Sequence, residues 1–402
     1  MKVLVVNAGS SSVKYAVIET DGENTVSEGI VERIGLDGTR MKGVAASGSE
    51  FEAEAPEVKD TRDAMQLIGR TLVDAGKGAV GSLGEIEAVG HRVVHGGEDF
   101  SDPTVIDDRV MAVIRDLFAL APLHNPVNYA GIEAAMELLG AVPHVAVFDT
   151  AFHSTIPDRA FIYGIPYEYY SEKKIRKYGF HGTSHKYVTI RAAEMLGKPL
   201  DSTNVITCHL GNGCSITAVR DGRSIDTSMG LTPLEGVMMG TRSGNIDPAI
   251  LVHLQESEGM SAAEVGKMLN KQSGLLGLAG VGSSDMRDVL AARAEGNKQA
   301  DLAFRAYAYR IRLYVGAYAA AVGKLDAVVF TGGIGENSPD VRSEVCHGLE
   351  CLGIEYDVEL NKAKTPDGDI AKAGMERRIL IIATQEDTMI ARETASVVGA
   401  EA

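Results

Sequence analysis

Residues 3–17 read V-L-V-V-N-A-G-S-S-S-V-K-Y-A-V, and residues 205–219 read V-I-T-C-H-L-G-N-G-C-S-I-T-A-V. Each stretch is a short apolar segment, a turn of small residues and a second apolar segment, which predicts a β-hairpin. An acidic residue and a glycine follow each copy, Asp21-Gly22 and Asp221-Gly222, as is typical of a tight turn into a further strand. The repeated pattern predicts a duplicated fold with one copy in each half of the chain.

The turns of both hairpins are rich in Gly, Ser and Asn. Such residues let backbone N–H groups approach an anion without a Cβ in the way. Two of these turns, in equivalent places of two halves, indicate a polyphosphate site in a cleft between the copies. Two ordinary hairpins are the alternative, because Gly and Ser are common in plain turns.

The rest of the chain mixes helical and strand patterns, which predicts an α/β protein. We expect helices at 61–75, at 125–139 with Asn125 as N-cap and Pro126 at the first helical position, and from 184. We expect strands at 86–97, 142–149, 326–331 and 378–383. The predicted domains are 1–150, joined by a returning helix at 386–402, and 151–385. A glycine-rich segment at 226–247 has no periodicity, so we expect it to be functional or mobile.

Composition excludes several classes of protein. The chain has 402 residues, 45% of them hydrophobic and 23% charged, and a net charge of −16, which argues against nucleic-acid or anionic-membrane partners. Its four cysteines lack C-x-x-C spacing, so we expect neither a zinc site nor a disulfide framework. The start does not resemble a signal peptide, and no apolar run is long enough for a bilayer. We expect a cytoplasmic protein.

Several catalytic signatures are missing from the sequence. It has no G-x-x-x-x-G-K-[ST] loop, no protein-kinase signature, no complete dinucleotide fingerprint and no G-x-S-x-G elbow. His181 and His185 have helical spacing, but the glutamate of H-E-x-x-H is absent, so a zinc site is not expected. A histidine that stabilises charge beside a transferring group fits this pattern better.

A few charged residues stand where chemistry would need them. Lys14 follows the first turn and could meet a phosphate, or could be an exposed strand lysine. Arg92 alternates with Val94 in an apolar strand, which suits a small carboxylate with a short apolar tail, although an arginine reaching to water fits too. Asp149 ends a strand, as active-site carboxylates and turn aspartates both do. Arg242 lies on the glycine-rich segment and could contact a transferring phosphoryl group, or could be solvated.

Nine motifs, in order along nearly the whole chain, together resemble the acetate kinase family. They are N-A-G-S-S-S-V-K-Y, G-H-R-V-V-H-G-G, L-H-N-P, V-F-D-T-A-F-H, Y-G-F-H-G-T-S-H, C-H-L-G-N-G-C-S, M-G-T-R-S-G-N-I-D-P, F-T-G-G-I-G-E-N and A-T-Q-E-D. The resemblance implies two ribonuclease-H-like domains of the actin-like ATPase fold, flanking an ATP cleft. It also implies reversible phosphoryl transfer from ATP to acetate by direct in-line attack.

The resemblance also implies roles for individual residues. Arg92 and Arg242 would hold the carboxylate and the phosphoryl group, His181 would stabilise the charge in transit, and Asp149 would be the catalytic carboxylate, as a base or an orienting group. Mg²⁺, which Mn²⁺ could replace, would bind Asn7 and Glu386. The substrate's acyl group would contact Val94, Leu123, His124, Phe180 and Pro233. ATP would contact Ser10, Ser12, Lys14, His209, Leu210, Gly211, Asn212, Gly213, Asp285, Met286, Arg287, Gly332, Gly333, Ile334, Gly335 and Glu336.

Two other functions remain open on the sequence alone. A kinase for propionate or another short-chain acid would need only a slightly wider pocket, since one methylene is worth about 1–3 kcal/mol. An ATP-driven conformational switch on the same fold would turn over ATP without any carboxylate. The resemblance further implies a homodimer, for which the tyrosine-rich stretch at 306–318 is a candidate surface.

Overall fold

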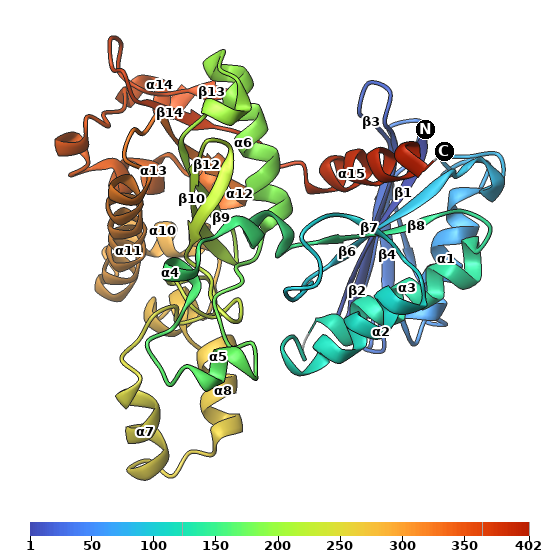
Figure 1. Ribbon diagram of the computed structural model, residues 1–402, viewed down its shortest axis with the longest axis horizontal. Helices are drawn as coiled ribbons and strands as arrows, with labels where there is room; N and C mark the ends of the chain where they lie inside the picture. The colour runs from blue at the N-terminus through green and yellow to red at the C-terminus, as the bar shows by residue number, and fades with distance from the viewer. Residues whose placement is uncertain (123, 364, 402) are drawn as a thin grey trace. The chain divides into compact units, whose positions relative to one another are not determined.

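The computed structural model describes residues 1–122, 124–363 and 365–401 (Figure 1). The chain divides into two compact units. Unit 1 comprises Met1–Phe152 and Gln385–Ala402, and unit 2 comprises His153–Thr384. Each unit is built on one mixed β-sheet.

Unit 1 contains an eight-stranded sheet in the order β5-β4-β3-β2-β1-β6-β8-β7. Its strands are β1 Lys2–Gly9, β2 Ser12–Glu19, β3 Asn24–Glu32, β4 Arg40–Val44, β5 Glu50–Glu54, β6 Ala88–Val93, β7 Thr104–Val105 and β8 His144–Phe148. Its helices are α1 Thr61–Leu72, α2 Asp108–Asp116, α3 Asn125–Leu139 and α15 Glu386–Glu401.

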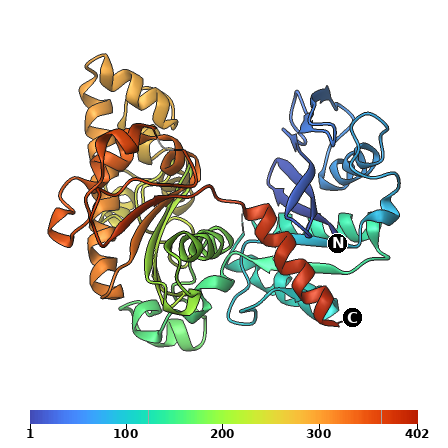
Figure 2. The same ribbon diagram turned by 90° about the horizontal axis from the view of Figure 1, so that it is seen from above.

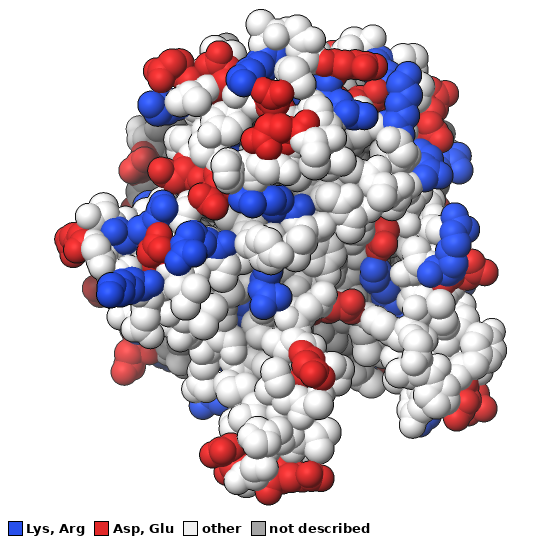
Figure 3. Space-filling view, turned by 90° about the vertical axis from the view of Figure 1, so that its left-hand side faces the viewer, with Lys and Arg blue, Asp and Glu red and all other residues white. Residues whose placement is uncertain are grey.

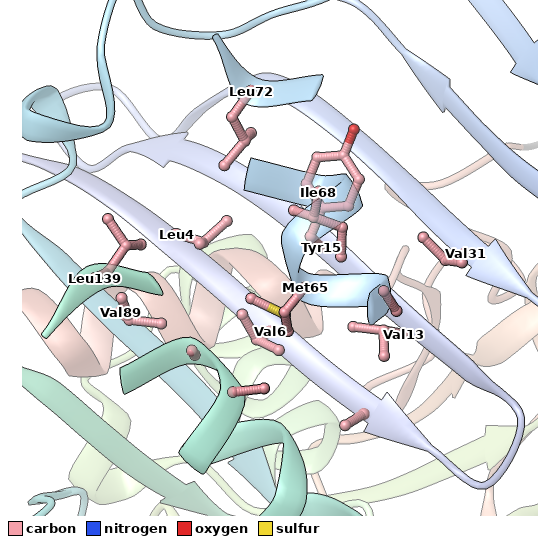
Figure 4. Packing of buried hydrophobic residues seen from close by; sticks show 14 of the residues in the cluster. Leu4, Val6, Val13, Tyr15, Val31, Met65, Ile68, Leu72, Val89 and Leu139 are labelled. Carbon is pink, nitrogen blue, oxygen red and sulfur yellow. The ribbon is translucent and has the colours of Figure 1, made fainter. Parts of the chain in front are cut away.

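Alternation along β1 decides which helices cover which face of this sheet. Leu4 and Val6 point into a core that they share with α1 and α3, where Met65 is fully buried (Figure 4). Val3 and Val5 point the opposite way, into a second core completed by α15. In Figures 1 and 2, α15 (red) lies across the strands of this sheet, far from them in sequence. Each fully buried Leu, Ile, Val or Met side chain contributes about 1.5–3 kcal/mol.

Unit 2 contains a six-stranded sheet in the order β11-β10-β9-β12-β14-β13. Helix α6 packs on β9 and β12, while α11 packs on β10, and the two helices lie on opposite sides of the sheet (Figure 1). The strands are β9 Val205–Leu210, β10 Cys214–Arg220, β11 Arg223–Thr227, β12 Ala327–Thr331, β13 Gly368–Asp369 and β14 Arg378–Ile381. The helices are α4 Asp158–Phe161, α5 Glu168–Ser171, α6 Gly182–Leu196, α7 Ala249–Glu256, α8 Ala262–Lys271, α9 Gly274–Leu278, α10 Met286–Ala294, α11 Lys298–Val322, α12 Gly332–Asn337, α13 Pro339–Cys346 and α14 Val358–Ala363.

The two sheets share one topology. In unit 1 the antiparallel strands β3-β2-β1 continue into parallel β6 and β8, and in unit 2 the antiparallel strands β11-β10-β9 continue into parallel β12 and β14. Both predicted hairpins are present, as β1–β2 and β9–β10. The prediction of a duplicated α/β fold of the ribonuclease-H-like kind is therefore confirmed.

Two local predictions differ in detail from the structure. Asp221 and Gly222 both have positive φ (51° and 70°), as a two-residue type I′ turn requires, whereas the β2–β3 turn places Gly22 and Glu23 in that region instead. Asn125 is the first residue of α3 rather than its N-cap, which is His124. The Asn125 amide is occupied elsewhere, because it exchanges two hydrogen bonds with the backbone of His95.

On the face drawn in Figure 3, both blue Lys and Arg and red Asp and Glu residues lie among broad uncharged areas, and neither sign of charge covers the face. Among the helices of the described residues, none has both the length and the apolar character needed to cross a bilayer. An anionic ligand would therefore need a local group of cations within an acidic protein.

Candidate active site

Arg92 and Asp149 form an ion pair at the carboxyl ends of two neighbouring strands. Arg92 Nε lies 3.0 and 3.1 Å from the two Asp149 carboxylate oxygens, and Arg92 Nη2 lies 2.6 Å from Asp149 Oδ2. The parallel register of β6 and β8 places Arg92 opposite Val147, so Asp149 follows the end of β8 beside it. The Asp149 carboxylate is 1% exposed and the Arg92 side chain 21%. One edge of the guanidinium therefore holds Asp149 while part of the group still reaches solvent.

Arg92 keeps its positive charge because neighbouring carboxylates stabilise it. Burial opposes its charged form, but Asp149, Glu386 and Asp387 outweigh this effect, so the pKa of Arg92 lies above its usual value. Glu386 and Asp387 belong to the start of α15, which brings them electrostatically close to Arg92 within unit 1. A substrate carboxylate at Arg92 would thus meet a cation that Asp149 already orients.

Asn128, which the sequence did not single out, supports this corner of unit 1. Asn128 accepts a hydrogen bond from Val94 N (3.0 Å) and donates one to the Ala8 carbonyl (2.8 Å), which joins the ends of β6 and β1. Val94 is 7% exposed. His124 precedes α3 and its carbonyl accepts from the first turn of that helix. Leu123 lies outside the described residues.

The first hairpin presents Asn7 and Lys14 on one face of the sheet, because they are cross-strand partners on β1 and β2. Ser10 and Ser12 lie at the turn, where Ser12 pairs with Gly9. Lys14 also lines a hollow of about 650 Å³ on the face of β2–β5, together with Asp387 from α15. Lys14 therefore stands beside the start of α15.

The described residues contain no group of three or more His, Cys, Asp and Glu side chains that could hold a metal ion. Mg²⁺ bound with a nucleotide needs fewer protein ligands, since it keeps waters and phosphate oxygens. Burial and then the neighbouring Glu386 raise the pKa of Asp387, while Lys14 and Arg92 act in the opposite sense. The surplus negative charge at the start of α15 is chemically suited to a hard cation.

In unit 2, His181 immediately precedes α6 and has a left-handed backbone (φ 58°, ψ 25°). Its Nδ1 lies 2.8 Å from Ser215 Oγ on β10. Its ring packs on that of His209, with centroids 4.3 Å apart, and His209 Nδ1 lies 2.8 Å from Ser184 Oγ. The His181 ring is therefore fixed in position from two sides.

Arg242 and His181 converge on Gly213, in the second hairpin turn. A Cβ at Gly213 would lie 3.4 Å from His181 Nε2 and 3.5 Å from Arg242 Nη1. Within the described residues, Arg242 Nη1 donates to the Pro233 carbonyl (3.3 Å) and toward Met239 Sδ (3.8 Å), and no carboxylate lies within ion-pair distance. Burial lowers the pKa of Arg242. A partly buried cation without a counter-ion, beside a histidine, is a site for an anion.

Long-range hydrogen bonds anchor the segment that carries Arg242. Glu235 hydrogen-bonds to Tyr163 Oη, and Asn245 bonds to both Gly236 N (2.8 Å) and Tyr314 Oη (2.8 Å). Val237, Met238 and Met239 are buried between these contacts. The segment was expected to be functional or mobile, and these long-range hydrogen bonds hold it without any periodic structure.

Two of the residues predicted to contact the acyl group lie in unit 2. Phe180, directly before His181, is 2% exposed, and its carbonyl lies 3.0 Å from His153 Nε2. Pro233 is half-buried and its carbonyl accepts from Arg242. Phe180 is therefore the sequence neighbour of His181, and Pro233 is a hydrogen-bond partner of Arg242.

Helix α12, which contains residues 332–336, is held from inside the protein. Glu336 Oε1 accepts from Gly332 N (2.8 Å) and Thr384 N (3.1 Å), so its carboxylate fixes the start of this helix. Arg342, 1% exposed, donates to the carbonyls of Gly335 and Glu336, both at 2.8 Å. Sequence reasoning missed Arg342, since a single arginine in a helix gives no signal.

A cavity of about 620 Å³ in unit 2 brings together three predicted nucleotide-binding segments. Asp285 caps α10 and forms an ion pair with Arg287 (2.6 Å), which holds the pKa of Asp285 at about 2. The cavity is lined by Gly211, Asn212, Ser284, Asp285, Met286, Arg287, Leu290, Gly333, Ile334, Asn337, Ser338, Pro339 and Asp340. His209, Leu210, Gly213, Gly332, Gly335 and Glu336 are not part of its lining, and Leu210 is fully buried. The lining residues that were not predicted are Ser284, Leu290, Asn337, Ser338, Pro339 and Asp340.

The chain is similar to known proteins over almost its whole length. The sequence model of the Acetokinase family matches residues 2–392. The chain is 52% identical over 400 residues to an acetate kinase from Thermotoga maritima, with 99% of each chain covered. It is also 52% identical over 402 residues to an acetate kinase from Dictyoglomus thermophilum, covering 99% of this chain and all of that one.

Solved structures give the same result. The acetate kinase of Porphyromonas gingivalis superimposes with a TM-score of 0.94 and 44% identity over 99% of both chains. A propionate kinase from Francisella tularensis superimposes with a TM-score of 0.92 and 43% identity, over 98% of this chain and 99% of the other.

Proposed function

Because this chain belongs to the acetokinase family, we propose that it transfers the γ-phosphoryl group of ATP to acetate, giving acetyl phosphate and ADP, reversibly. An acetate carboxylate oxygen forms the new bond to γ-phosphorus, and the bond from γ-phosphorus to the β–γ bridging oxygen breaks. No proton needs to move, since acetate is ionised at neutral pH.

The observation that carries this function is the unpaired cation at Arg242. Phosphoryl transfer needs positive charge and hydrogen-bond donors around the three equatorial oxygens, and little covalent chemistry. Arg242 and His181 converge on Gly213 in the turn of the second hairpin, and Arg242 has no carboxylate partner among the described residues. These features support a role for both side chains at the transferring group.

In unit 1, Arg92 is the proposed acetate ligand. Asp149 already holds one edge of its guanidinium by three contacts, which favours an orienting role for Asp149 over that of a general base. Val94 and His124 belong to the same unit, and with Phe180 and Pro233 of unit 2 they would contact the acyl group.

The nucleotide is proposed to occupy the 620 Å³ cavity of unit 2, with Lys14, Ser10 and Ser12 of unit 1 assisting its phosphates. Asn7 and Glu386 would hold Mg²⁺, for which Mn²⁺ could substitute. When bound, the metal ion neutralises phosphate charge. The acidic start of α15 supports this assignment.

Propionate is the second candidate substrate, because a propionate kinase has nearly the same fold as this chain. We propose acetate as the better substrate, since a buried Val94 leaves less room than a smaller residue would. One methylene changes the preference by only about 1–3 kcal/mol, so the difference is graded.

The test is acyl phosphate formation from Mg-ATP with acetate, propionate, butyrate or no acid, trapped with hydroxylamine. We expect acetate to give the fastest reaction, propionate a slower one and butyrate a rate near background. ATP turnover that ignores the acid would refute the function and favour the ATPase switch. Faster turnover of propionate would instead make this chain a propionate kinase.

We also propose a homodimer. Leu302, Tyr309 and Leu313 on α11 are each more than half exposed and fall on one side of the helix, since they are seven and four residues apart. Light scattering with wild type and Tyr309→Glu tests this surface. Cytoplasmic location stays a prediction.

A further inference from the structure

A row of buried polar side chains stands behind His181. Ser215 Oγ on β10 lies 2.8 Å from His181 Nδ1 and 2.7 Å from His185 Nε2 on α6. His185 Nδ1 in turn lies 2.7 Å from Thr207 Oγ1 on β9. Ser215, His185 and Thr207 are all fully buried. Three hydrogen bonds therefore connect the His181 ring to the interior of unit 2.

The hydrogen bond between Thr207 and His185 fixes the donor and acceptor of the other two. Among the described residues, Thr207 Oγ1 has one hydrogen-bond partner, His185 Nδ1. If this buried hydroxyl only accepted, its proton would have no acceptor, which costs free energy. An oxygen lone pair without a donor costs much less. Thr207 is therefore the donor and His185 Nδ1 the acceptor.

His185 carries a single ring proton. Burial, and then the nearby His153 and His209, keep the pKa of His185 well below its usual value. Because Nδ1 accepts, this proton is on Nε2 and is donated to Ser215 Oγ. The hydroxyl proton of Ser215 is then directed to His181 Nδ1, which leaves the His181 proton on Nε2.

We propose, on the basis of the proposed kinase function, that Thr207, His185 and Ser215 are positioning residues that hold His181 as the neutral Nε2–H tautomer. The Nε2 atom is the one that lies beside the Gly213 Cβ position, next to Arg242 Nη1. His181 thus donates a hydrogen bond from Nε2 to an equatorial phosphoryl oxygen without a positive charge of its own.

The same network disfavours a second proton on His181. Ser215 Oγ would then accept from both histidines, and its own proton would remain buried without an acceptor. A second cation would also lie beside Arg242, whose charge is uncompensated within the described residues. Each group in this row donates to the next, and hydrogen bonds in such a chain polarise and strengthen one another. The three hydrogen bonds therefore stabilise the same tautomer of His181 together.

The first measurement is the tautomer of His181 in the wild-type protein, by ¹⁵N NMR of histidine-labelled enzyme, with the resonance assigned from His181→Asn. We expect Nε2 to carry the proton and Nδ1 to be unprotonated and to accept a hydrogen bond. A proton on Nδ1, or on both nitrogens at neutral pH, overturns the proposal. This spectrum requires no turnover, so its result is independent of the kinase assignment.

The second measurement is the kinetics of Ser215→Ala, Ser215→Thr and a matched control, Thr217→Val. Thr217 is also a buried hydroxyl of β10, but it bonds to Thr227 and not to His181. We expect Ser215→Ala to lower kcat roughly 10- to 100-fold, the equivalent of one buried hydrogen bond, with each KM within about threefold of wild type. Ser215→Thr restores most of kcat because it keeps the hydroxyl, and Thr217→Val stays near wild type.

Equal losses in Ser215→Ala and Thr217→Val, or a Ser215→Ala enzyme with wild-type kcat, would overturn the proposal. Should Ser215→Ala not fold, Thr207→Val replaces it, with an expected fall in kcat of about two- to fivefold and a changed His185 Nδ1 resonance. Wild-type enzyme that fails to phosphorylate acetate at all would refute the proposed function, while the His181 tautomer would still be measured.

Discussion

Replacing Asp149 by alanine removes the counter-ion of Arg92 and leaves a guanidinium that is largely surrounded by protein. The three contacts between these side chains would be lost, and the Arg92 side chain, 21% exposed, would be left with its charge unmatched on one edge. Breaking a buried pair by removing one partner costs about 3–5 kcal/mol. Because part of Arg92 still reaches water, we expect a loss at or below the lower end of this range, about 2–3 kcal/mol.

A double-mutant cycle measures this interaction in the free energy of unfolding. Asp149→Ala, Arg92→Met and the double variant are compared with wild type by urea unfolding. Arg92→Met alone removes the Arg92 cation from the 1% exposed Asp149 carboxylate, so we expect it to cost at least as much as Asp149→Ala. The double variant removes both charges and should lose less than the sum, with a coupling of about 2–3 kcal/mol.

Asp149→Asn separates orientation from base catalysis. Its amide oxygen can still accept from Arg92, so an orienting role predicts kcat at least about tenfold above that of Asp149→Ala. A general base would leave both variants equally inactive. Additive unfolding free energies in the cycle would refute the ion-pair argument. Asp301→Ala is the control, because its bonds to Arg293 and Arg305 are surface pairs worth less than about 1 kcal/mol.

Three further outcomes follow from charge and burial. Arg242→Met should lower kcat about 10³-fold or more while leaving the urea midpoint unchanged or higher, since it removes a charge that burial disfavours; a clear loss of stability would contradict this. Arg342→Met should destabilise unit 2 by about 2–4 kcal/mol, because the carbonyls of Gly335 and Glu336 lose their buried donor, and circular dichroism in urea measures this. Burial lowers the pKa of both His95 and His153 to about 4, so the unfolded chain binds these protons first and stability should decline as pH falls from about 6.5 toward 4. His153→Gln should flatten that decline in urea titrations between pH 7.5 and 4.5, and an unchanged slope would show that His153 does not contribute.

The fold could be predicted because its signals are local and occur twice. A strand, a small-residue turn and a second strand are read within fifteen residues, and their repetition at 205 indicated the duplication before any pairing was known. Helix starts were less certain wherever a capping residue had another use. Asn125 is such a case, since its amide bonds to the backbone of His95, thirty residues away.

The sequence suggested individual residues of the candidate site, but it did not indicate how they are arranged. Arg92 and Asp149 were each singled out, but their pairing depends on the parallel register of β6 and β8, which no local pattern specifies. The loop at 226–247 gives no periodic signal, and the hydrogen bonds that hold it come from side chains distant in sequence, such as Tyr163 and Tyr314. Arg342 gave no signal because its acceptors, the carbonyls of Gly335, Glu336 and Asn361 and the Asn361 side-chain oxygen, come together only in the folded chain.

The return of α15 to unit 1 has a consequence for synthesis of the chain. Val3, Val5 and the other residues of the second core in unit 1 meet Ile390 and Ala391 of α15, and the whole of unit 2 is translated in between. At about 5–20 residues per second, this apolar face waits on the order of tens of seconds on the ribosome before its cover emerges. Nascent chains stalled before α15 should therefore bind chaperones that recognise exposed apolar strands.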